Sequence, residues 1–326
     1  MSRPLAPTMV RALSLALDRP AATRYEVVAQ FAHQYSIVAL CLALGVSRSG
    51  FYAWRGRRSR PLEENPRAGA TEALRVAIQA CHARSRGTYG SPRVYADLVA
   101  QGIRCSRRRV ARLMASLALR GCRRNGHRAR SATRSGPALR KPAPDLVRRA
   151  FAVDAVAHID RVWVADTTAI RTGEGWLHCA VVLDLRSRRV VGWSMSDILD
   201  ATLTGDALRM ALRRRRPRHG QGLIHHSDRG STYTAASFQA LLHEAGIACS
   251  MGRLGTCLDN AVAETFFATL KVELVHRRRW ATRAAAIQEI FAYVETWYNP
   301  YRRHGSIGYV SPVAFEAATS LPVPAA

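Results

Sequence analysis

From residue 161 onward the sequence pattern changes from helices to strands, and this ordered series of elements constrains the fold more than any other feature. Apolar, β-rich stretches at 162–166, 176–185 and 190–195 predict three consecutive strands, and the turn LRSRR suits a hairpin between the last two. The periodicity then predicts helix, strand, helix, strand and helix over 202–216, 223–228, 234–245, 247–251 and 254–274.

Three strands in a meander followed by that alternation is the order of elements in a ribonuclease-H-like fold. The predicted fold class is therefore α/β, with a five-stranded mixed sheet covered by helices, over residues 156–318. At 326 residues the chain is long enough for two or three domains, and helical patterns fill the part that precedes the sheet.

The last of these predicted helices, LGTCLDNAVAETFFATLKVEL (254–274), carries two different faces. Apolar residues recur every four positions along it and form one buried stripe. Glu264 lies off that stripe, and Asn260, Phe267 and Lys271 share its side. Taken alone, this helix is interpreted most simply as having a solvated polar face. Two aspartates earlier in the sequence favour a functional interpretation of that face instead.

Three carboxylates fall where an α/β sheet can build a site. Asp166 ends the first predicted strand, Asp228 ends the fourth, and Glu264 lies on the last helix. Converging carboxylates repel one another and need a cation, and hard oxygen ligands suit Mg²⁺ or Mn²⁺. Two such ions ~3.5–4 Å apart can activate an attacking oxygen and stabilise a leaving one in phosphoryl transfer. Each aspartate taken singly is more typical of a strand-end turn, so the interpretation depends on all three together.

The net charge of +26 is typical of a nucleic-acid-binding protein, although a membrane-surface or ribosomal protein has the same property. The charge is uneven, because residues 1–150 hold 29 Lys+Arg against 7 Asp+Glu, whereas residues 151–326 hold 20 against 16. The first half is therefore the predicted binding half. Seven cysteines without a C-x-x-C pair predict a reduced, cytoplasmic protein, and no apolar run reaches the length of a membrane span.

Residues 1–60 predict a helical module of the helix-turn-helix type. A helix over 37–44, a turn that contains glycine and a helix over 47–54 follow that order. The alternative is a small helical unit whose aromatic residues only build its core. The side chains of the second helix that would contact DNA are Arg48, Tyr52 and Arg55.

Residues 70–122 predict a second helical DNA-binding module, whose last helix covers 107–119. One face of that helix is apolar and the other is cationic, and the charge of the region favours a phosphate-tracking surface over a merely solvated face. Residues 123–155 are basic and aperiodic, which predicts a linker able to lie along DNA. The cationic face consists of Arg107, Arg108, Arg109 and Arg112.

The motifs of this chain resemble those of the IS-three family of bacterial insertion-sequence transposases, specifically the second-frame (OrfB) product. Asp228 and Glu264 are separated by 35 residues, which is the family's D-D-35-E spacing. The resemblance covers roughly residues 25–318 and extends more distantly to retroviral integrase cores. It rests on WVADTT, VVLDLRSRRVVGW, LIHHSDRGSTYT, LDNAVAETFFATLK, WYNPYRRHGSIGY and SPVAFE, with GVSRSGFYAWR and RGTYGSPRVYADL upstream.

This resemblance implies a DDE transposase with an integrase catalytic core. Metal-dependent hydrolysis at the insertion-sequence ends would expose a 3′-hydroxyl, which then attacks a second phosphodiester without a covalent protein–DNA intermediate. The implied partners are double-stranded DNA, the first-frame (OrfA) product or a fusion with it, and further copies of the chain, in the nucleoid-associated cytoplasm. The implied residues are Asp166, Asp228 and Glu264 as catalytic ligands of two Mg²⁺ or Mn²⁺ ions, and Lys271, Asn260, Arg302 and Arg303 as DNA contacts or their support.

Three places depart from the family pattern without removing a ligand, the first of them the motif ADTTAI, where TDITYI is more usual. Thr232 stands where Gln is common and Gly305 where Ser is common, and both bear on DNA handling. A catalytically inactive DNA-binding regulator derived from a transposase therefore remains an alternative. A second alternative is a nuclease of the same fold that acts on RNA–DNA hybrids, against which the long basic N-terminal half argues.

Overall fold

The computed structural model describes residues 7–59, 66–122, 143–252 and 260–320, and the chain divides into two units, Met1–Gln79 and Ala80–Ala326. The boundary falls inside one helix, α5 (Pro66–Arg84). No single helix in the described part of the chain is long and apolar enough to cross a membrane. Only the bent pair Ile37–Ala43 and Arg48–Gly56 meets that criterion together, by length and composition alone.

Within the first unit, the helices described before residue 60 pack around a small aromatic core. Leu40 and Phe51 are buried, and the Trp54 ring stacks on Phe51 with ring centroids 5.9 Å apart. The Ser47 hydroxyl accepts the Gly50 N–H at 3.1 Å, so Ser47 caps the last helix of this group. The helices are α1 (Pro7–Ala16), α2 (Ala21–Phe31), α3 (Ile37–Ala43) and α4 (Arg48–Ser59).

A second group of helices comprises α5, α6 (Ser91–Ala100) and α7 (Arg107–Ser116). The Ser106 hydroxyl accepts the Arg109 N–H at 3.2 Å and caps α7. Helix α5 begins at Pro66, because proline fits the first turn of a helix. Beyond α7, Gly121 lies against the backbone of Gly90 so closely that any Cβ would clash, which explains glycine there.

The central sheet has five strands in the order β3-β2-β1-β4-β5. The first three strands form an antiparallel meander, whereas β4 runs parallel to β1 and β5 runs parallel to β4. The predicted five-stranded mixed sheet of a ribonuclease-H-like core is therefore confirmed. The strands are β1 (Val162–Thr172), β2 (Gly175–Asp184), β3 (Val190–Ser196), β4 (Ile224–Ser227) and β5 (Ala248–Met251).

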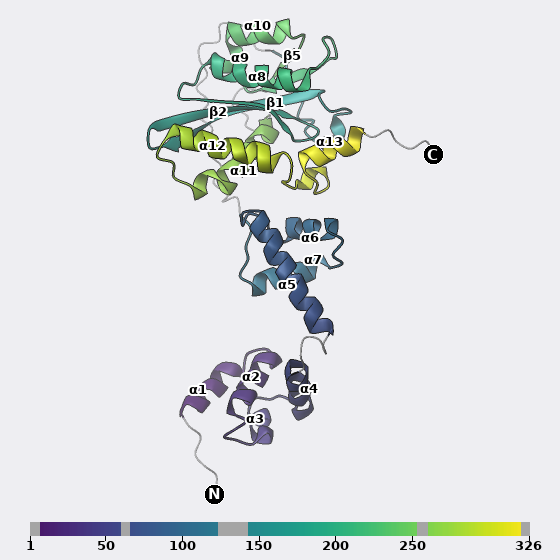
Figure 1. Cartoon of the computed structure of the whole chain (residues 1–326), viewed down its shortest axis with the longest axis vertical. Coiled ribbons are helices and arrows are strands. Elements are labelled where there is room, and N and C mark those ends of the chain that lie inside the picture. Colours follow the sequence, from purple (N-terminus) through teal and green to yellow (C-terminus); the bar gives the residue numbers. More distant parts are fainter. Residues whose placement is uncertain (1–6, 60–65, 123–142, 253–259, 321–326) are drawn as a thin grey trace, which may run out of the picture. The chain divides into compact units, whose positions relative to one another are not determined.

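Helices cover both faces of this sheet (Figure 1). On one face lie α8 (Ala201–Arg215), α9 (Ser231–Thr234) and α10 (Ala236–Glu244), and on the other lie α11 (Ala261–Glu273), α12 (Arg283–Tyr293) and α13 (Pro312–Ser320). Trp163, Leu208 and Phe238 belong to one buried cluster between the sheet and α8 and α10. Gly192 permits this packing, because a Cβ there would clash with the carbonyl oxygen of Ala207. Short helical turns cover Val153–Ala155, Val275–Arg277, Val294–Tyr298 (a π-helix) and Gly305–Ile307.

Two predicted boundaries that bear on the site differ from the structure. Strand β1 does not end at Asp166 but continues to Thr172, because its second half pairs with β2 as a long hairpin. Helix α11 begins at Ala261 rather than at residue 254, and Asn260 occupies its N-cap position. Residues 253–259, which include the predicted start of this helix, lie outside the described residues.

The predicted linker 123–155 does not keep that character throughout. Residues 123–142 lie outside the described part of the chain, but the residues that follow pack against β5. The Leu146 N–H donates to Ser250 Oγ at 2.9 Å, and the Pro144 carbonyl accepts the Met251 N–H at 3.3 Å. The end of the predicted linker therefore belongs to the sheet domain.

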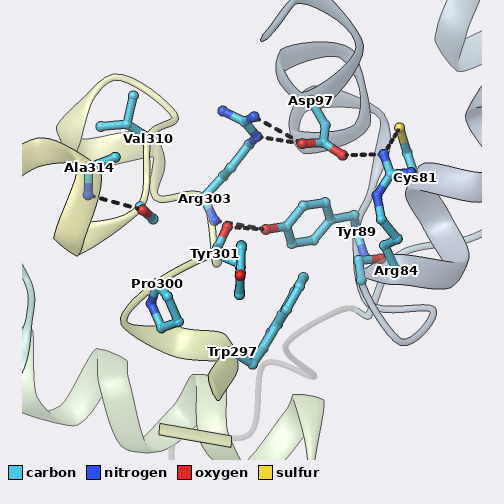
Figure 2. Close-up of a pocket in the computed structure, with 12 residues that line it drawn as sticks. Cys81, Arg84, Tyr89, Asp97, Trp297, Pro300, Tyr301, Arg303, Val310 and Ala314 are labelled. Carbon is cyan, nitrogen blue, oxygen red and sulfur yellow. Dashed lines mark hydrogen bonds and ion pairs between the residues drawn. The ribbon is translucent and has the colours of Figure 1, made fainter. Parts of the chain in front are cut away.

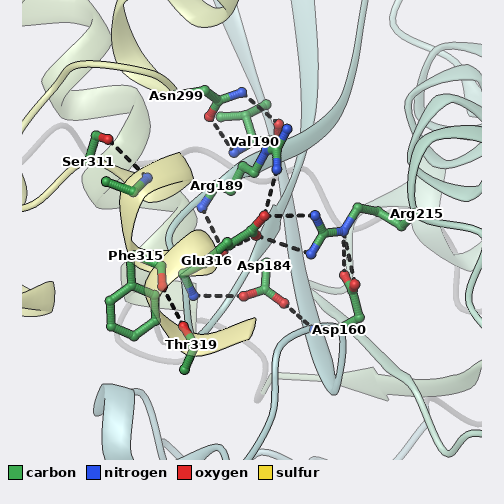
Figure 3. A network of polar contacts seen from close by, with 12 residues as sticks. Asp160, Asp184, Arg189, Val190, Arg215, Asn299, Ser311, Phe315, Glu316 and Thr319 are labelled. Carbon is green, nitrogen blue, oxygen red and sulfur yellow. Dashed lines mark hydrogen bonds and ion pairs between the residues drawn. The ribbon is translucent and has the colours of Figure 1, made fainter. Parts of the chain in front are cut away.

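A buried ion network holds α13 on this domain (Figure 3). The Glu316 carboxylate accepts hydrogen bonds from Arg189 Nη1 at 2.6 Å and Arg215 Nη1 at 2.9 Å, and also from the Ser187 hydroxyl at 2.8 Å. Arg215 reaches Asp160 as well, with Nε 2.8 Å from Oδ1. Burial alone would raise the pKa of Glu316, but the hydrogen bonds from Arg215 and Arg189 outweigh it and lower that pKa.

Candidate active site and DNA-binding surfaces

The pairing register of β1 and β4 places two of the predicted catalytic carboxylates at the same level of the sheet. Val164 on β1 pairs with His226 on β4, and the two strands are parallel. Asp166 follows Val164 by two residues on β1, and Asp228 follows His226 by two residues, directly after the last residue of β4. Each carboxylate is oriented by a backbone donor, since Thr167 N–H donates to Asp166 at 2.8 Å and Gly230 N–H donates to Asp228 at 2.9 Å.

Helix α11 is fastened to β1 immediately beside Asp166. The buried Asn260 amide donates from Nδ2 to the carbonyl oxygen of Ala165 at 2.9 Å. Because Asn260 is the N-cap residue of α11, this bond fixes the start of the helix that carries Glu264 against the strand that carries Asp166. The structure therefore gives Asn260 a contact inside the protein, which the sequence anticipates only as support for the site.

The electrostatics of Asp166 indicate that the three carboxylates are neighbours. Burial, and then the charge of Asp228, raise the pKa of Asp166 from 3.8 to about 8, and the charge of Glu264 raises it further. The hydrogen bond from Thr167 and the charge of Lys271 act in the opposite direction. Since all of these groups act on Asp166, β1, the end of β4 and one face of α11 meet at one place.

The donor set suits a hard divalent cation, although the carboxylates are not gathered at ligating distance. In the described ranges no three His, Cys, Asp or Glu side chains form a group that could hold a metal ion as they stand. The repulsion that raises the pKa of Asp166 is what a cation would relieve, and its binding there must displace a proton. Asn260 Oδ1 is buried and has no hydrogen-bond partner among the described residues, so a further oxygen acceptor belongs to the side chain that is bonded to Ala165, the residue before Asp166. The residues present therefore fit Mg²⁺ or Mn²⁺ chemically.

Sequence reasoning missed one polar group near this site. Tyr233 lies on α9, five residues after Asp228, and its buried hydroxyl has no hydrogen-bond partner within the described residues. Burial, and then the charges of Asp166 and Asp228, raise its pKa well above the usual value. Its sequence context, STYT, gives no signal beyond a short helix, so only the folded structure reveals its proximity.

The cationic face predicted on α7 is accessible. Arg107, Arg108 and Arg112 are exposed and Arg109 is half-buried, while Val110, Leu113 and Met114 form the buried side of the helix. Helix α7 contains no acidic residue that would neutralise this face. On α4, the three side chains predicted to contact DNA, Arg48, Tyr52 and Arg55, are likewise exposed. Lys271 on α11 is half-buried.

Arg302 corrects the prediction of a DNA contact in the motif WYNPYRRHGSIGY. Its side chain is 3% exposed and forms a bidentate pair with Glu273, with Nη2–Oε1 at 2.7 Å and Nε–Oε2 at 2.9 Å. The guanidinium also lies over the Tyr298 ring, 5.7 Å from its centroid. A guanidinium enclosed in this way is a structural group of the core and is not presented to DNA.

Arg303, the neighbouring residue predicted to contact DNA, has partners inside the protein. Its Nη2 lies 2.9 Å from Asp97 Oδ1 on α6, and its Nη1 donates to the Tyr309 carbonyl at 2.8 Å. Its side chain keeps 18% of its surface exposed. Arg303 therefore joins the sheet domain to the second group of helices.

Comparison with known proteins agrees with this architecture. A family described as an HTH-like domain matches residues 70–127, and two families described as an integrase core domain match residues 157–257 and 264–319. The chain is 41% identical to the "Insertion element IS600 uncharacterized 31 kDa protein" of Shigella sonnei over 276 residues, which is 85% of this chain and 97% of that protein. It is 38% identical to the "Transposase InsF for insertion sequence IS3A" of Escherichia coli over 299 residues, which is 90% of this chain and 98% of that protein.

Among solved structures, the catalytic core domain of BIV integrase is similar, with a TM-score of 0.34 and 19% sequence identity over 49% of this chain and 95% of that chain. The chain is therefore a transposase of the insertion-sequence type, in which an HTH-like domain is followed by an integrase core. The chain belongs to the IS3 family of transposases, which we called the IS-three family above.

Proposed function

We propose that this chain is a DDE transposase that cleaves DNA at the ends of an insertion sequence and joins the exposed 3′-hydroxyl to a second phosphodiester. The observation that carries the proposal is the parallel β1–β4 register, which brings Asp166 level with Asp228, beside the helix that carries Glu264. Membership of the IS3 family supplies the reaction class. The same core in a nuclease would not need the exposed cationic face of α7.

The three carboxylates would bind Mg²⁺ or Mn²⁺, and two such ions would supply Lewis-acid assistance to both the attacking and the leaving oxygen. The backbone N–H groups of Thr167 and Gly230 orient the two aspartates, and the Asn260–Ala165 bond holds α11, and with it Glu264, at the strand. Lys271 adds a positive charge near Asp166, which suits a DNA phosphate held beside the carboxylates.

DNA contacts outside this centre are assigned to the two helical regions. The exposed Arg107, Arg108 and Arg112 would track phosphates, and Arg48, Tyr52 and Arg55 would do so from the first unit. Bringing two DNA ends together requires at least two copies of the chain. The first-frame product, alone or fused to this chain, would add recognition of the terminal repeats.

The test is Mg²⁺- or Mn²⁺-dependent cleavage and joining of labelled insertion-sequence ends, with wild type compared to Glu264→Gln. We expect the variant to lose at least about 100-fold in cleavage rate, because a metal ligand is removed, while its DNA affinity stays within about twofold. Glu289→Gln is the matched control, since Glu289 forms a surface pair with Arg278, and it should cleave like wild type. Equal cleavage by Glu264→Gln and wild type would refute the assignment of Glu264.

The alternative of an inactive regulator predicts a different set of results. DNA would be bound by every variant and cut by none, even with the first-frame fusion present. Cleavage by the wild type in either form excludes it.

A further inference from the structure

Helix α6 of the second helical region is bonded to the segment that follows α12, and both lie within the unit Ala80–Ala326 (Figure 2). Arg303 Nε and Nη2 lie 3.0 and 2.9 Å from Asp97 Oδ1. The Arg303 backbone N–H donates to the Tyr89 hydroxyl oxygen at 2.7 Å, and Arg93 Nε donates to the Arg303 carbonyl at 3.0 Å. We call these four residues, Tyr89, Arg93, Asp97 and Arg303, the α6–core contact.

Burial makes this contact more than a surface ion pair. Tyr89 is 2% exposed, and its ring centroid lies 5.7 Å from that of Trp297 on the sheet-domain side. A second bond crosses nearby, where Arg277 Nη1 donates to the Arg86 carbonyl at 2.8 Å. Both side chains of the central ion pair are about one-fifth exposed, so the charges are poorly screened by water.

The charges within the contact are unequal, and this makes it sensitive to substitution. Asp97 faces two guanidiniums, because Arg84 Nη2 lies 3.1 Å from its Oδ2 while Arg303 approaches its Oδ1 (Figure 2). Arg84 belongs to the helical region itself, at the end of α5, so of these two guanidiniums only that of Arg303 comes from the sheet domain. Loss of the Asp97 carboxylate would leave two cations side by side and would drive the two regions apart.

We propose that the α6–core contact is a positioning device that holds α7 at a fixed distance from the carboxylate centre. Because this distance is fixed, the position on the DNA at which α7 binds determines which phosphodiester lies at Asp166, Asp228 and Glu264. Asp97 and Arg303 are positioning residues in this scheme, because they touch neither the DNA nor the reacting atoms. The holding function stands on the contacts alone, whereas its effect on the cut rests on the proposed function above.

The holding function is tested without DNA. A protease site is placed within residues 123–142 of the full chain, the folded protein is cut, and the fragments are followed by size-exclusion chromatography and titration. The wild-type fragments should stay together, whereas Asp97→Arg and Arg303→Asp should each weaken their association at least about tenfold. The double variant Asp97→Arg/Arg303→Asp should restore the association of the fragments. Arg84→Ala, which removes the partner of Asp97 that lies in the same fragment, should leave the association constant within about threefold of wild type. Wild-type fragments that separate on cutting would overturn the proposal, and so would single variants that remain joined.

The effect on reaction is read from the position of the cut, not its rate. On an end-labelled insertion-sequence DNA the wild type should cut one phosphodiester, whereas each single variant should spread its cuts over neighbouring positions, and the double exchange should narrow them again. A merely structural role would lower the yield and the melting temperature without moving the cut, and that result would refute the positioning role. If the wild type cuts nothing, either alone or fused to the first-frame product, the proposed function fails while the fragment test still decides the holding function.

Discussion

Removing the Glu273 charge provides a sharp test of the structural role assigned to Arg302. Glu273 and Arg302 side chains are 5% and 4% exposed, and their bidentate pair is completed by the Tyr293 hydroxyl, which donates to Glu273 Oε2 at 2.8 Å. Glu273→Gln keeps the shape of the side chain but leaves the guanidinium buried without its counter-charge. Breaking a buried pair from one side costs about 3–5 kcal/mol of unfolding free energy, and the near-complete burial here argues against any solvent discount.

The assay is urea denaturation followed by tryptophan fluorescence, which reports mainly on the unit Ala80–Ala326 because five of the six tryptophans lie in it. The matched control is Asp206→Asn, which breaks an exposed pair with Arg209 and should cost no more than about 0.5 kcal/mol. The double variant Glu273→Gln/Arg302→Met removes both charges and should lose less than the two single losses combined. A loss for Glu273→Gln as small as that of the control would show that water reaches the Arg302 charge, and would return Arg302 to the candidates for DNA binding.

Two further predictions concern pH and salt. Burial, and to a smaller extent the charge of His226, lowers the pKa of His225 from 6.5 to about 3. Between pH 6.5 and pH 3 His225 is therefore protonated in the unfolded chain and neutral in the folded chain. Its contribution to stability is complete above pH 6.5 and declines on acidification, by about 4 kcal/mol at pH 3; urea titrations of His225→Phe should show a shallower decline, and an unchanged slope would contradict the assignment. Arg108→Ala on α7 should reduce the slope of log K against log salt by ~0.9 if Arg108 contacts one phosphate, as measured by DNA-binding titrations. Arg209→Ala, an exposed arginine on α8, should leave that slope unchanged, and an equal effect of both would mean that only net charge matters.

The sheet could be predicted from sequence because its signals are local. A strand buried on both faces reads as a continuous apolar run, as 176–185 does, and the order of such runs limits the topology. The end of β1 could not be predicted in the same way, because residues after Asp166 remain a strand through pairing with β2 and not through their own pattern. The level placement of Asp166 and Asp228 likewise depends on register, which only the folded sheet provides.

The internal partners of Arg302 and Arg303 could not be predicted from the sequence, and the reason is physical. A guanidinium pairs equally well with a phosphate or a carboxylate, so its role depends on which acid the fold brings to it. Arg302 and Arg303 are adjacent, yet one meets Glu273, 29 positions away, and the other meets Asp97, 206 positions away. No local pattern contains that information.

The same reasoning separates the net charge of a region from its capacity to bind DNA. In the sheet domain, Arg215 forms ion pairs with Glu316 and Asp160, and Arg302 forms one with Glu273. Part of the positive charge of this domain is therefore neutralised by internal ion pairs. In α7, by contrast, three of the arginines on the cationic face are exposed and the helix contains no acid. An exposed arginine on a helix without acidic residues can offer its charge to a phosphate, whereas the charge of Arg302 is already paired with Glu273 inside the protein, so α7 stays the predicted DNA-binding surface.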